Sequence, residues 1–279
     1  MTLPDGRTLG FAQYGDPEGH PVFYFHGGLS CRIDATSVDA VAAEMGINVI
    51  APDRPGVGLS DRHKGASLLN WPDDVSALAD ELDFDRFAVM GWSFGGAYAA
   101  SCGYALADRV RATVLIASGI PRDWTGMLEG IDRMDRIFLK LSGRGALLDE
   151  GAFVAIRKLA RTAPALFVKQ AVSTMSEQSR DAIARDPQEF IDATVMALAD
   201  PGGALDDYRI WNRPWGFDVA QIPGPVQVWQ GDQDELCPPE WAQRLENTIP
   251  TAELHMVPGA GHFVARDHWA EILDSALRG

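Results

Sequence analysis

A serine flanked by glycines stands where a strand pattern gives way to a helix pattern. The run 91–95, Gly-Trp-Ser-Phe-Gly, follows the apolar segment 87–90 and precedes the small residues of segment 97–100. A strand that reverses directly into a helix crowds its own backbone, and glycines on either side of the corner remove the Cβ atoms that would collide. The corner residue then projects its side chain clear of the sheet. The spacing therefore predicts a nucleophile at Ser93.

A serine hydroxyl is a weak nucleophile, so it needs a base, and the base needs a group that orients it. Chemistry in parallel sheets gathers at the carboxyl ends of strands. Asp234 follows the predicted strand 225–230, and His262 lies on a glycine-rich turn after the predicted strand 253–257. The chain order serine, aspartate, histidine is that of one fold class. We expect Ser93, Asp234 and His262 to act together.

Other residues compete for two of these roles. Asp232 is the main alternative acid because it follows the same strand, and Asp123, after the predicted strand 112–117, is a more remote one. The remaining histidines are expected to be solvated or structural, and His26 is expected to hydrogen-bond backbone below the site; the others are His20, His63, His255 and His268. Asp53 and Arg54 are expected to fix their own loop.

The elements that must position these side chains alternate along the chain. Strand patterns are predicted within a hairpin at 2–15 and at 21–25, 47–51, 87–90, 112–117, 225–230 and 253–257. Helix patterns are predicted at 35–45, 69–82, 97–106, 239–247 and 264–277. Such alternation is typical of α/β proteins with a parallel sheet. We expect about eight strands, mostly parallel, flanked by helices.

The alternation stops in the middle of the sequence. From 122 to 208 helical patterns occur without a convincing strand, at 127–141, 152–160, 164–175 and 187–198. We therefore predict a core made of residues 1–121 and 214–279, with an inserted helical cap at 122–213. The cap should lie over Ser93. Leu29, Trp92, Trp124, Met134 and Phe138 are candidates to line an apolar substrate pocket, and plain core packing is the alternative for each. Trp211 and Trp215 are expected to be structural.

Composition limits the partners. The chain has 279 residues and a formal net charge of −15, which disfavours contact with nucleic acid or an anionic membrane. No apolar run reaches the roughly 20 residues of a membrane span, and the first residues do not resemble a secretory signal. Three scattered cysteines, Cys31, Cys102 and Cys237, indicate a reduced, cytoplasmic protein. A small-molecule substrate is expected, and monomer and homodimer both stay open.

Five ordered motifs resemble the α/β-hydrolase family, in its capped serine esterase and proline-iminopeptidase-like branch. They lie at 26–28 (His-Gly-Gly), 53–60, 91–96, 231–234 and 261–262. The resemblance implies an oxyanion hole made by the backbone N–H groups of Phe94 and Gly28, with Leu29 as a substitute for Gly28. It implies no metal and no organic cofactor. Leu29 stands where peptidase relatives often have proline, which argues against aminopeptidase activity.

These observations favour a serine hydrolase that cleaves an ester, or an amide, of a small and largely apolar substrate. Ser93 argues against the relatives that use an aspartate nucleophile. The same triad serves C–C bond hydrolysis, acyl transfer and perhydrolysis, so these chemistries stay open. A ligand-binding protein with little turnover is the alternative from another class.

Overall fold

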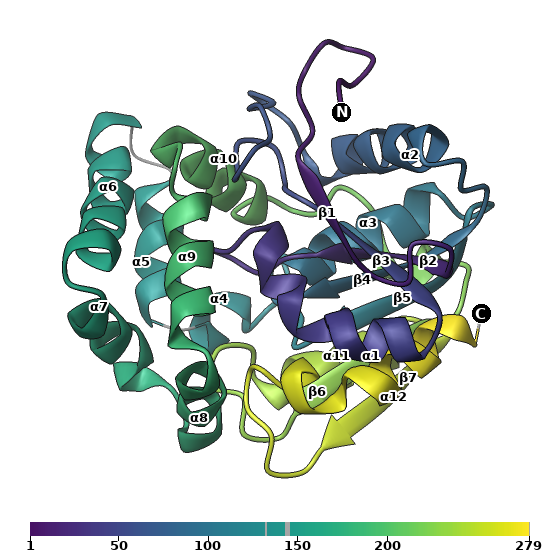
Figure 1. The fold of residues 1–279 in the computed structure, drawn as a ribbon. Coiled ribbons are helices and arrows are strands. Elements are labelled where there is room, and N and C mark those ends of the chain that lie inside the picture. Colours follow the sequence, from purple (N-terminus) through teal and green to yellow (C-terminus); the bar gives the residue numbers. More distant parts are fainter. Residues whose placement is uncertain (132, 143–145, 279) are drawn as a thin grey trace.

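A twisted sheet lies at the centre of the computed structural model, which describes residues 1–131, 133–142 and 146–278 (Figure 1). The described residues form a seven-stranded sheet in the order β1-β3-β2-β4-β5-β6-β7. The strands are β1 (Phe11–Gly15), β2 (His20–Phe25), β3 (Ile47–Pro52), β4 (Phe87–Trp92), β5 (Val110–Ile116), β6 (Val226–Gly231) and β7 (Ala252–Val257). Every pair is parallel except β1 with β3. The mostly parallel α/β sheet is therefore confirmed.

The N-terminal segment corrects the predicted strand number. Thr2 and Thr8 form an isolated bridge, and Leu3 N–H donates to the Arg7 carbonyl at 2.7 Å. This pairing closes a tight loop. It does not form the first strand of the predicted hairpin. β1 pairs with β3 instead, where Phe11 stands opposite Pro52. The sheet has seven strands because the first half of the predicted hairpin forms its backbone hydrogen bonds within its own loop and does not pair with the sheet.

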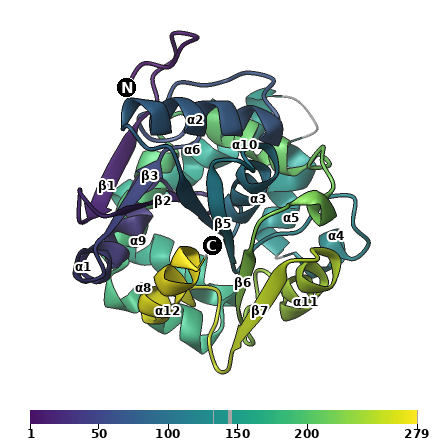
Figure 2. The same cartoon turned by 90° about the vertical axis from the view of Figure 1, so that its right-hand side faces the viewer.

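Helices cover both faces of the sheet (Figure 2). α2 (Trp71–Glu81), α3 (Gly95–Ala105) and α11 (Pro239–Thr248) cover one face, and α1 (Asp39–Glu44) and α12 (Ala265–Leu277) cover the other. The short 3-10 helices are η1 (Arg32–Val38), η2 (Leu68–Asn70), η3 (Val172–Thr174) and η4 (Val219–Gln221). Each face has its own cluster of buried apolar side chains. These two cores hold the carboxyl ends of the strands in fixed positions.

The remaining helices lie between β5 and β6 in sequence, and most of them form a group beside the sheet (Figure 1). They are α4 (Met127–Gly130), α5 (Arg133–Leu141), α6 (Ala146–Thr162), α7 (Pro164–Ala171), α8 (Glu177–Arg185), α9 (Pro187–Ala197) and α10 (Pro201–Trp211). The predicted helix 127–141 is two helices, because the first ends at Gly130 and the chain is extended at Ile131. The domain boundaries themselves stay a prediction.

The sequence patterns missed α8 and α10. α10 carries Gly202 and Gly203 in its first turn, and glycine weakens a helix pattern. A Cβ at Gly203 would lie 1.9 Å from the Gly56 carbonyl oxygen. Gly203 therefore allows α10 to pack closely on the 53–60 loop, and Gly202 lies against the Arg62 guanidinium. These tertiary contacts outweigh the poor helix propensity of the two glycines. Within the described residues, the helices are too short or too polar to cross a bilayer.

Candidate active site

Ser93 occupies a strained corner between β4 and α3. Its φ is +56°, a value that costs free energy for any residue other than glycine. Its N–H donates to the Ile116 carbonyl at 2.9 Å, which ties the corner to β5. A Cβ at Gly91 would lie 2.1 Å from the Gly95 carbonyl oxygen, and one at Gly95 would lie 2.0 Å from that of Phe25. Both glycines are therefore required by close backbone approach, as the spacing indicates.

The His-Gly-Gly loop after β2 lies directly on this corner. A Cβ at Gly27 would lie 2.7 Å from the Trp92 ring, and one at Gly28 would lie 3.2 Å from the Phe94 ring. Among the described residues, no backbone hydrogen bond uses the N–H of Gly28, Phe94 or Leu29. The site therefore offers free N–H groups from the two segments that the resemblance implies.

A buried ion pair holds that loop in place. Arg54 is completely buried and pairs with Asp207 of α10 at 2.7 Å. It also donates to the carbonyls of His26 and Gly27, and its guanidinium lies over the Tyr98 ring. The carboxyl of Asp207 accepts a further hydrogen bond from the Tyr98 hydroxyl. Arg54 thus joins the loop, α3 and α10, which fits the predicted structural role.

His26 is structural in the same network. Its Nε2 accepts the Arg54 backbone N–H at 3.2 Å, so Nδ1 carries the proton that faces the Gly27 carbonyl. Burial, helped by the charge of Arg54, holds the pKa of His26 well below its ordinary value. A neutral histidine with both ring nitrogens engaged is not available as a base.

Asp234 and His262 are in direct contact. His262 Nδ1 lies 3.0 Å and 3.1 Å from the two carboxylate oxygens. Oδ1 of Asp234 also accepts the N–H groups of Leu236 and Cys237, and Oδ2 accepts the Gln230 side-chain amide. Hydrogen bonds to both oxygens therefore fix the Asp234 carboxylate, which in turn fixes the orientation of the His262 imidazole.

The pKa of His262 reflects two opposing effects. Burial lowers it, and the negative charge and hydrogen bond of Asp234 raise it. The net result is a pKa above the ordinary value. An imidazole with this environment is a stronger base than a histidine in water. Among the described residues no hydrogen bond uses its Nε2, and His262 lines the cavity described below.

Trp92 links the histidine to the serine corner. Its indole N–H donates to the His262 carbonyl at 2.9 Å, and its ring contacts the His262 ring with centroids 5.2 Å apart. Cys237 also lies next to Ser93: burial and the negative charge of Asp234 raise the pKa of the Cys237 thiol, while a side-chain hydrogen bond with Ser93 lowers it. Ser93 and His262 also line the same cavity. The structure thus places Asp234 in contact with His262, and His262 and Ser93 on the wall of one cavity.

The alternative residues lie elsewhere. The carboxylate of Asp232 accepts the N–H of Gly259 at 2.7 Å, in an exposed turn, and Asp123 is exposed. His255 is structural as expected, since it stacks on Trp229 and bonds Gln227. Of the two acids that follow β6, only Asp234 contacts His262 among the described contacts.

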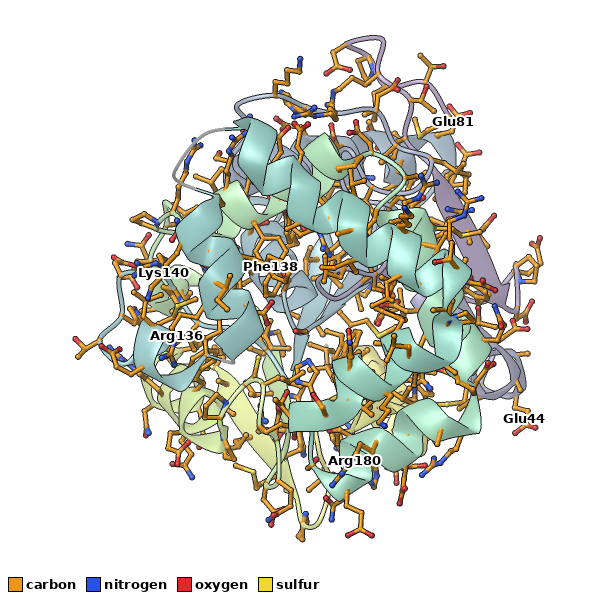
Figure 3. All side chains as sticks on the ribbon, turned by 90° about the vertical axis from the view of Figure 1, so that its left-hand side faces the viewer. Glu44, Glu81, Arg136, Phe138, Lys140 and Arg180 are labelled. Atoms are coloured by element: carbon orange, nitrogen blue, oxygen red, sulfur yellow. The ribbon has the colours of Figure 1, made fainter. Side chains whose placement is uncertain are left out.

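A cavity of about 480 Å³ opens over this site. Its floor holds Gly28, Ser93, Phe94 and His262, and the inserted helices supply most of its walls. The apolar part of the walls includes Phe138, Ile156, Leu159, Phe167, Met175, Phe190 and Tyr208. Figure 3 looks onto these helices, with Phe138 toward the interior and Arg136 and Lys140 of the same helix farther out. The cavity therefore suits a small, largely apolar molecule.

Some of the residues that were expected to line the pocket do so, and others do not. Leu29, Trp92 and Phe138 line the cavity. Trp124 does not, so that prediction is wrong: its ring stacks under Arg244 of α11 at 4.3 Å, because the chain after β5 turns toward α11 first. Met134 lies on α5, and its side chain falls outside what the structure describes.

Several polar residues that line the cavity were missed by the sequence patterns, among them Asp34, Glu189 and Arg266. Glu189 of α9 and Arg266 of α12 form an ion pair at 2.8 Å, and Asp34 lies on η1. They come from three separate elements and belong to no short motif. Only the packing of α9 and α12 on η1 brings them to one place.

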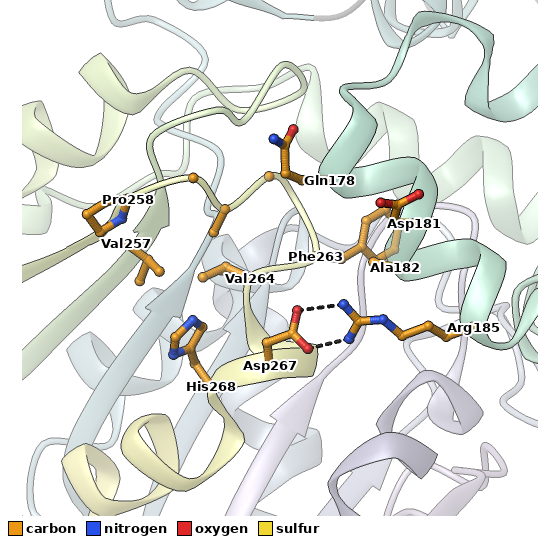
Figure 4. A pocket seen from close by; sticks show the side chains of 13 residues that line it. Gln178, Asp181, Ala182, Arg185, Val257, Pro258, Phe263, Val264, Asp267 and His268 are labelled. Atoms are coloured by element: carbon orange, nitrogen blue, oxygen red, sulfur yellow. Dashed lines mark hydrogen bonds and ion pairs between the residues drawn. The ribbon is translucent and has the colours of Figure 1, made fainter.

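A second cavity, of about 280 Å³, lies between α8 and the turn after β7 (Figure 4). An exposed ion pair between Arg185 and Asp267 crosses it. None of Ser93, Asp234 and His262 lines it. The chemistry that the sequence predicts therefore belongs to the first cavity.

Comparisons with known proteins find relatives in sequence and in fold. The chain is 26% identical, over 88% of its length and 83% of the relative's, to a 2-hydroxy-6-oxo-2,4-heptadienoate hydrolase from Pseudomonas putida. It is 25% identical to a protein named "Probable proline iminopeptidase" from Leptolyngbya boryana, over 92% of this chain and 85% of the other. A thermophilic esterase from Thermogutta terrifontis has a similar fold, with a TM-score of 0.71 and 22% identity over 99% of this chain and 96% of the other.

The match to a family model settles the classification. The model covers residues 22–275 and is described as the alpha/beta hydrolase family. This span includes the serine corner, both carboxyl-end loops and the inserted helices. The chain belongs to the alpha/beta hydrolase family.

Proposed function

We propose that this protein is a serine hydrolase that cleaves an ester of a small, largely apolar substrate through an acyl-enzyme on Ser93. The observation that carries the proposal is the Asp234–His262 contact beside a strained serine in an apolar cavity. His262 Nε2 takes the proton of the Ser93 hydroxyl as its oxygen attacks the substrate carbonyl. Asp234 holds the tautomer and stabilises the imidazolium that forms.

The oxyanion of the tetrahedral intermediate is held by the free N–H groups of Gly28 and Phe94. Such a donor contributes roughly 3 kcal/mol to transition-state stabilisation in measured cases. His262 then returns its proton to the leaving alcohol. Water enters, is deprotonated by His262 in its turn, and attacks the acyl-enzyme carbonyl to release the acid. The chain's own residues supply every group that these steps require.

We further propose that the helices of 122–213 act as a cap that sets substrate choice. Their side chains form most of the cavity wall around Ser93, which supports this role. The described cysteines are free and buried, which supports a reducing compartment and so a cytoplasmic location.

C–C bond hydrolysis is the second candidate. The relative named as a heptadienoate hydrolase, which is similar over most of the chain, favours it. The same serine, histidine and aspartate would serve that reaction, so the two functions differ in substrate rather than in machinery.

A fluorophosphonate probe tests the proposal first, because it labels a serine only when its base activates it. We expect Ser93 to be labelled in the intact protein and not in the Ser93→Ala variant. Ser101→Ala is the matched control, since Ser101 is a buried serine on α3 that donates to the Tyr98 carbonyl. A protein that leaves Ser93 unlabelled would instead be the ligand-binding alternative.

Turnover of a substrate panel then separates the two reactions. The panel comprises p-nitrophenyl esters of increasing acyl length, aminoacyl naphthylamides and vinylogous 1,5-diketones. We expect short and medium p-nitrophenyl esters to be hydrolysed, because the cavity wall is mostly apolar. Faster turnover of the diketones than of every ester would replace ester hydrolysis by C–C bond hydrolysis.

A further inference from the structure

The backbone of His262 is held by side chains from two other elements. Trp92 of β4 donates its indole N–H to the His262 carbonyl. The His262 N–H donates to the hydroxyl of Ser179, on α8, at 3.1 Å. Among the described residues no backbone carbonyl accepts this N–H, and His262 is 2% exposed. Since a buried N–H needs a partner, the Ser179 hydroxyl supplies the partner that the His262 turn does not.

The neighbours of Ser179 make its hydroxyl oxygen an acceptor. Ser179 is 1% exposed, and it donates its hydroxyl hydrogen to Oε2 of Glu235 at 3.4 Å. Glu235 follows Asp234 directly in the chain. A serine hydroxyl has one hydrogen and two lone pairs, so the lone pairs remain for the His262 N–H and for the Ser176 hydroxyl, which lies 3.1 Å away. One side chain of α8 thus contacts the backbone of the base and the residue next to the acid.

Close packing of α8 on the His262 turn makes this contact possible. A Cβ at Gly261 would lie 2.5 Å from the Ser179 hydroxyl oxygen and 3.2 Å from the Ser179 backbone nitrogen. A side chain at position 261 would therefore push α8 away from the turn. The glycine of the 261–262 motif is thus required for the approach of α8.

α8 also contacts α12 at two further points. The Ala182 carbonyl accepts Nη1 of Arg266 at 2.9 Å, and Arg185 pairs with Asp267 in the ion pair that Figure 4 shows. Neither contact involves His262. A substitution at Arg185 therefore loosens the attachment of α8 without removing a hydrogen bond of the base.

We propose that Ser179 is a positioning residue for His262, an inference that rests on the proposed function. Ser179 fixes the backbone from which the imidazole reaches Ser93, while Asp234 fixes the ring. Misplacement of a catalytic group by about 1 Å can lower a rate by about a hundredfold. Ser179 is not among the described residues that line the cavity, so it acts on the rate through His262 and not on substrate binding. Because α8 is one of the inserted helices, the reactivity of the serine depends on how these helices pack on the core.

The Ser179→Ala variant tests this by separating kcat from KM. Alanine favours a helix, so α8 should persist while the hydroxyl is lost. We expect kcat for p-nitrophenyl esters and the rate of fluorophosphonate labelling to fall by about tenfold, the effect of one buried donor left without a partner. KM should stay within about twofold, because the cavity wall is unchanged.

Arg185→Gln is the matched control, because it breaks the exposed ion pair of α8 with Asp267. We expect this variant to keep kcat within about threefold, as for other surface substitutions. Thermal unfolding checks that both variants are folded.

Hydrogen exchange measures the same contact without turnover. The chain has six histidines, so protein with isotopically labelled histidine nitrogen gives few backbone amide signals in a nuclear magnetic resonance spectrum. The His262→Gln variant identifies the signal of residue 262. We expect this amide to exchange slowly in the intact protein and in Arg185→Gln, and at least about tenfold faster in Ser179→Ala, because the N–H then has no acceptor.

The outcomes separate this inference from the proposed function. An unchanged exchange rate in Ser179→Ala overturns the positioning role, and so does a kcat within about threefold of the intact protein. A rise in KM that accounts for the loss, or an equal loss of kcat in Arg185→Gln, also overturns it. If the intact protein shows neither ester turnover nor labelling, the serine hydrolase proposal fails. Faster exchange in Ser179→Ala would then still show that Ser179 fixes the His262 backbone.

Discussion

Replacing Asp234 by asparagine should remove most activity by reversing the imidazole tautomer. The asparagine oxygen must take the Oδ1 position, because Oδ1 accepts the N–H groups of both Leu236 and Cys237. The amide nitrogen then takes the Oδ2 position and donates to His262 Nδ1. Nδ1 becomes the acceptor and Nε2 carries the hydrogen, so Nε2 can no longer accept the proton of Ser93.

The groups around residue 234 make a return to the original imidazole tautomer unfavourable. In the Oδ2 position the new amide also faces the Gln230 side-chain nitrogen, which donates to Asp234 at 2.9 Å. Gln230 could turn its unpartnered Oε1 toward it, but it would lose its bonds to the carbonyls of Gly231 and Cys237. We therefore expect the wrong tautomer to persist, and kcat to fall by about 10⁴, the loss that such a change produces in a serine protease.

Ester hydrolysis and fluorophosphonate labelling measure this loss, and thermal unfolding confirms that the variant folds. Asp232→Asn is the matched control, because Asp232 lies two residues away and contacts an exposed turn. We expect it to change kcat by less than about threefold, in line with the small effects of surface substitutions. If Asp232→Asn is the more damaging change, or if Asp234→Asn keeps kcat within tenfold, the assignment of the acid is wrong.

Three further predictions follow from the same geometry. Ser93→Ala should lower kcat by about 10⁴ to 10⁶, measured as ester turnover, and an unchanged rate would remove Ser93 from the mechanism. Arg54→Met leaves a buried carboxylate without its partner and should lower the free energy of unfolding in urea by about 3–5 kcal/mol. Arg62→Met breaks a more exposed ion pair and should lower the free energy of unfolding by less than about 1 kcal/mol. Similar losses of free energy for both variants would contradict the argument that burial makes the Arg54 pair the more important one. Because only neutral His262 accepts a proton and its pKa is raised, kcat/KM should rise with pH through a midpoint above the ordinary histidine value of about 6.5, and a midpoint below that value would contradict the influence of Asp234.

The local chemistry could be predicted from sequence because it depends on near neighbours. The glycines around Ser93 are required by a reversal that involves only adjacent residues, so the motif shows it directly. Asp234 and His262 could be placed because parallel strands present their carboxyl ends at one edge, wherever the strands lie in the sheet. Alternating strand and helix patterns sufficed for the fold class. They did not suffice for the first half of the predicted hairpin, whose backbone groups hydrogen-bond within their own loop.

The cavity was decided by tertiary structure. Trp124 and Phe138 look alike as apolar residues of the helical region, yet one packs on α11 and the other lines the cavity. Asp34 lies eight residues after His26 on a short 3-10 helix, and the sequence gives no sign that its carboxyl group is buried beside Glu189 and Arg266. Packing of distant elements removes these groups from water, and that removal changes their pKa values and their hydrogen-bonding capacity. Near neighbours in sequence specify the reacting groups, whereas long-range packing specifies what they act on.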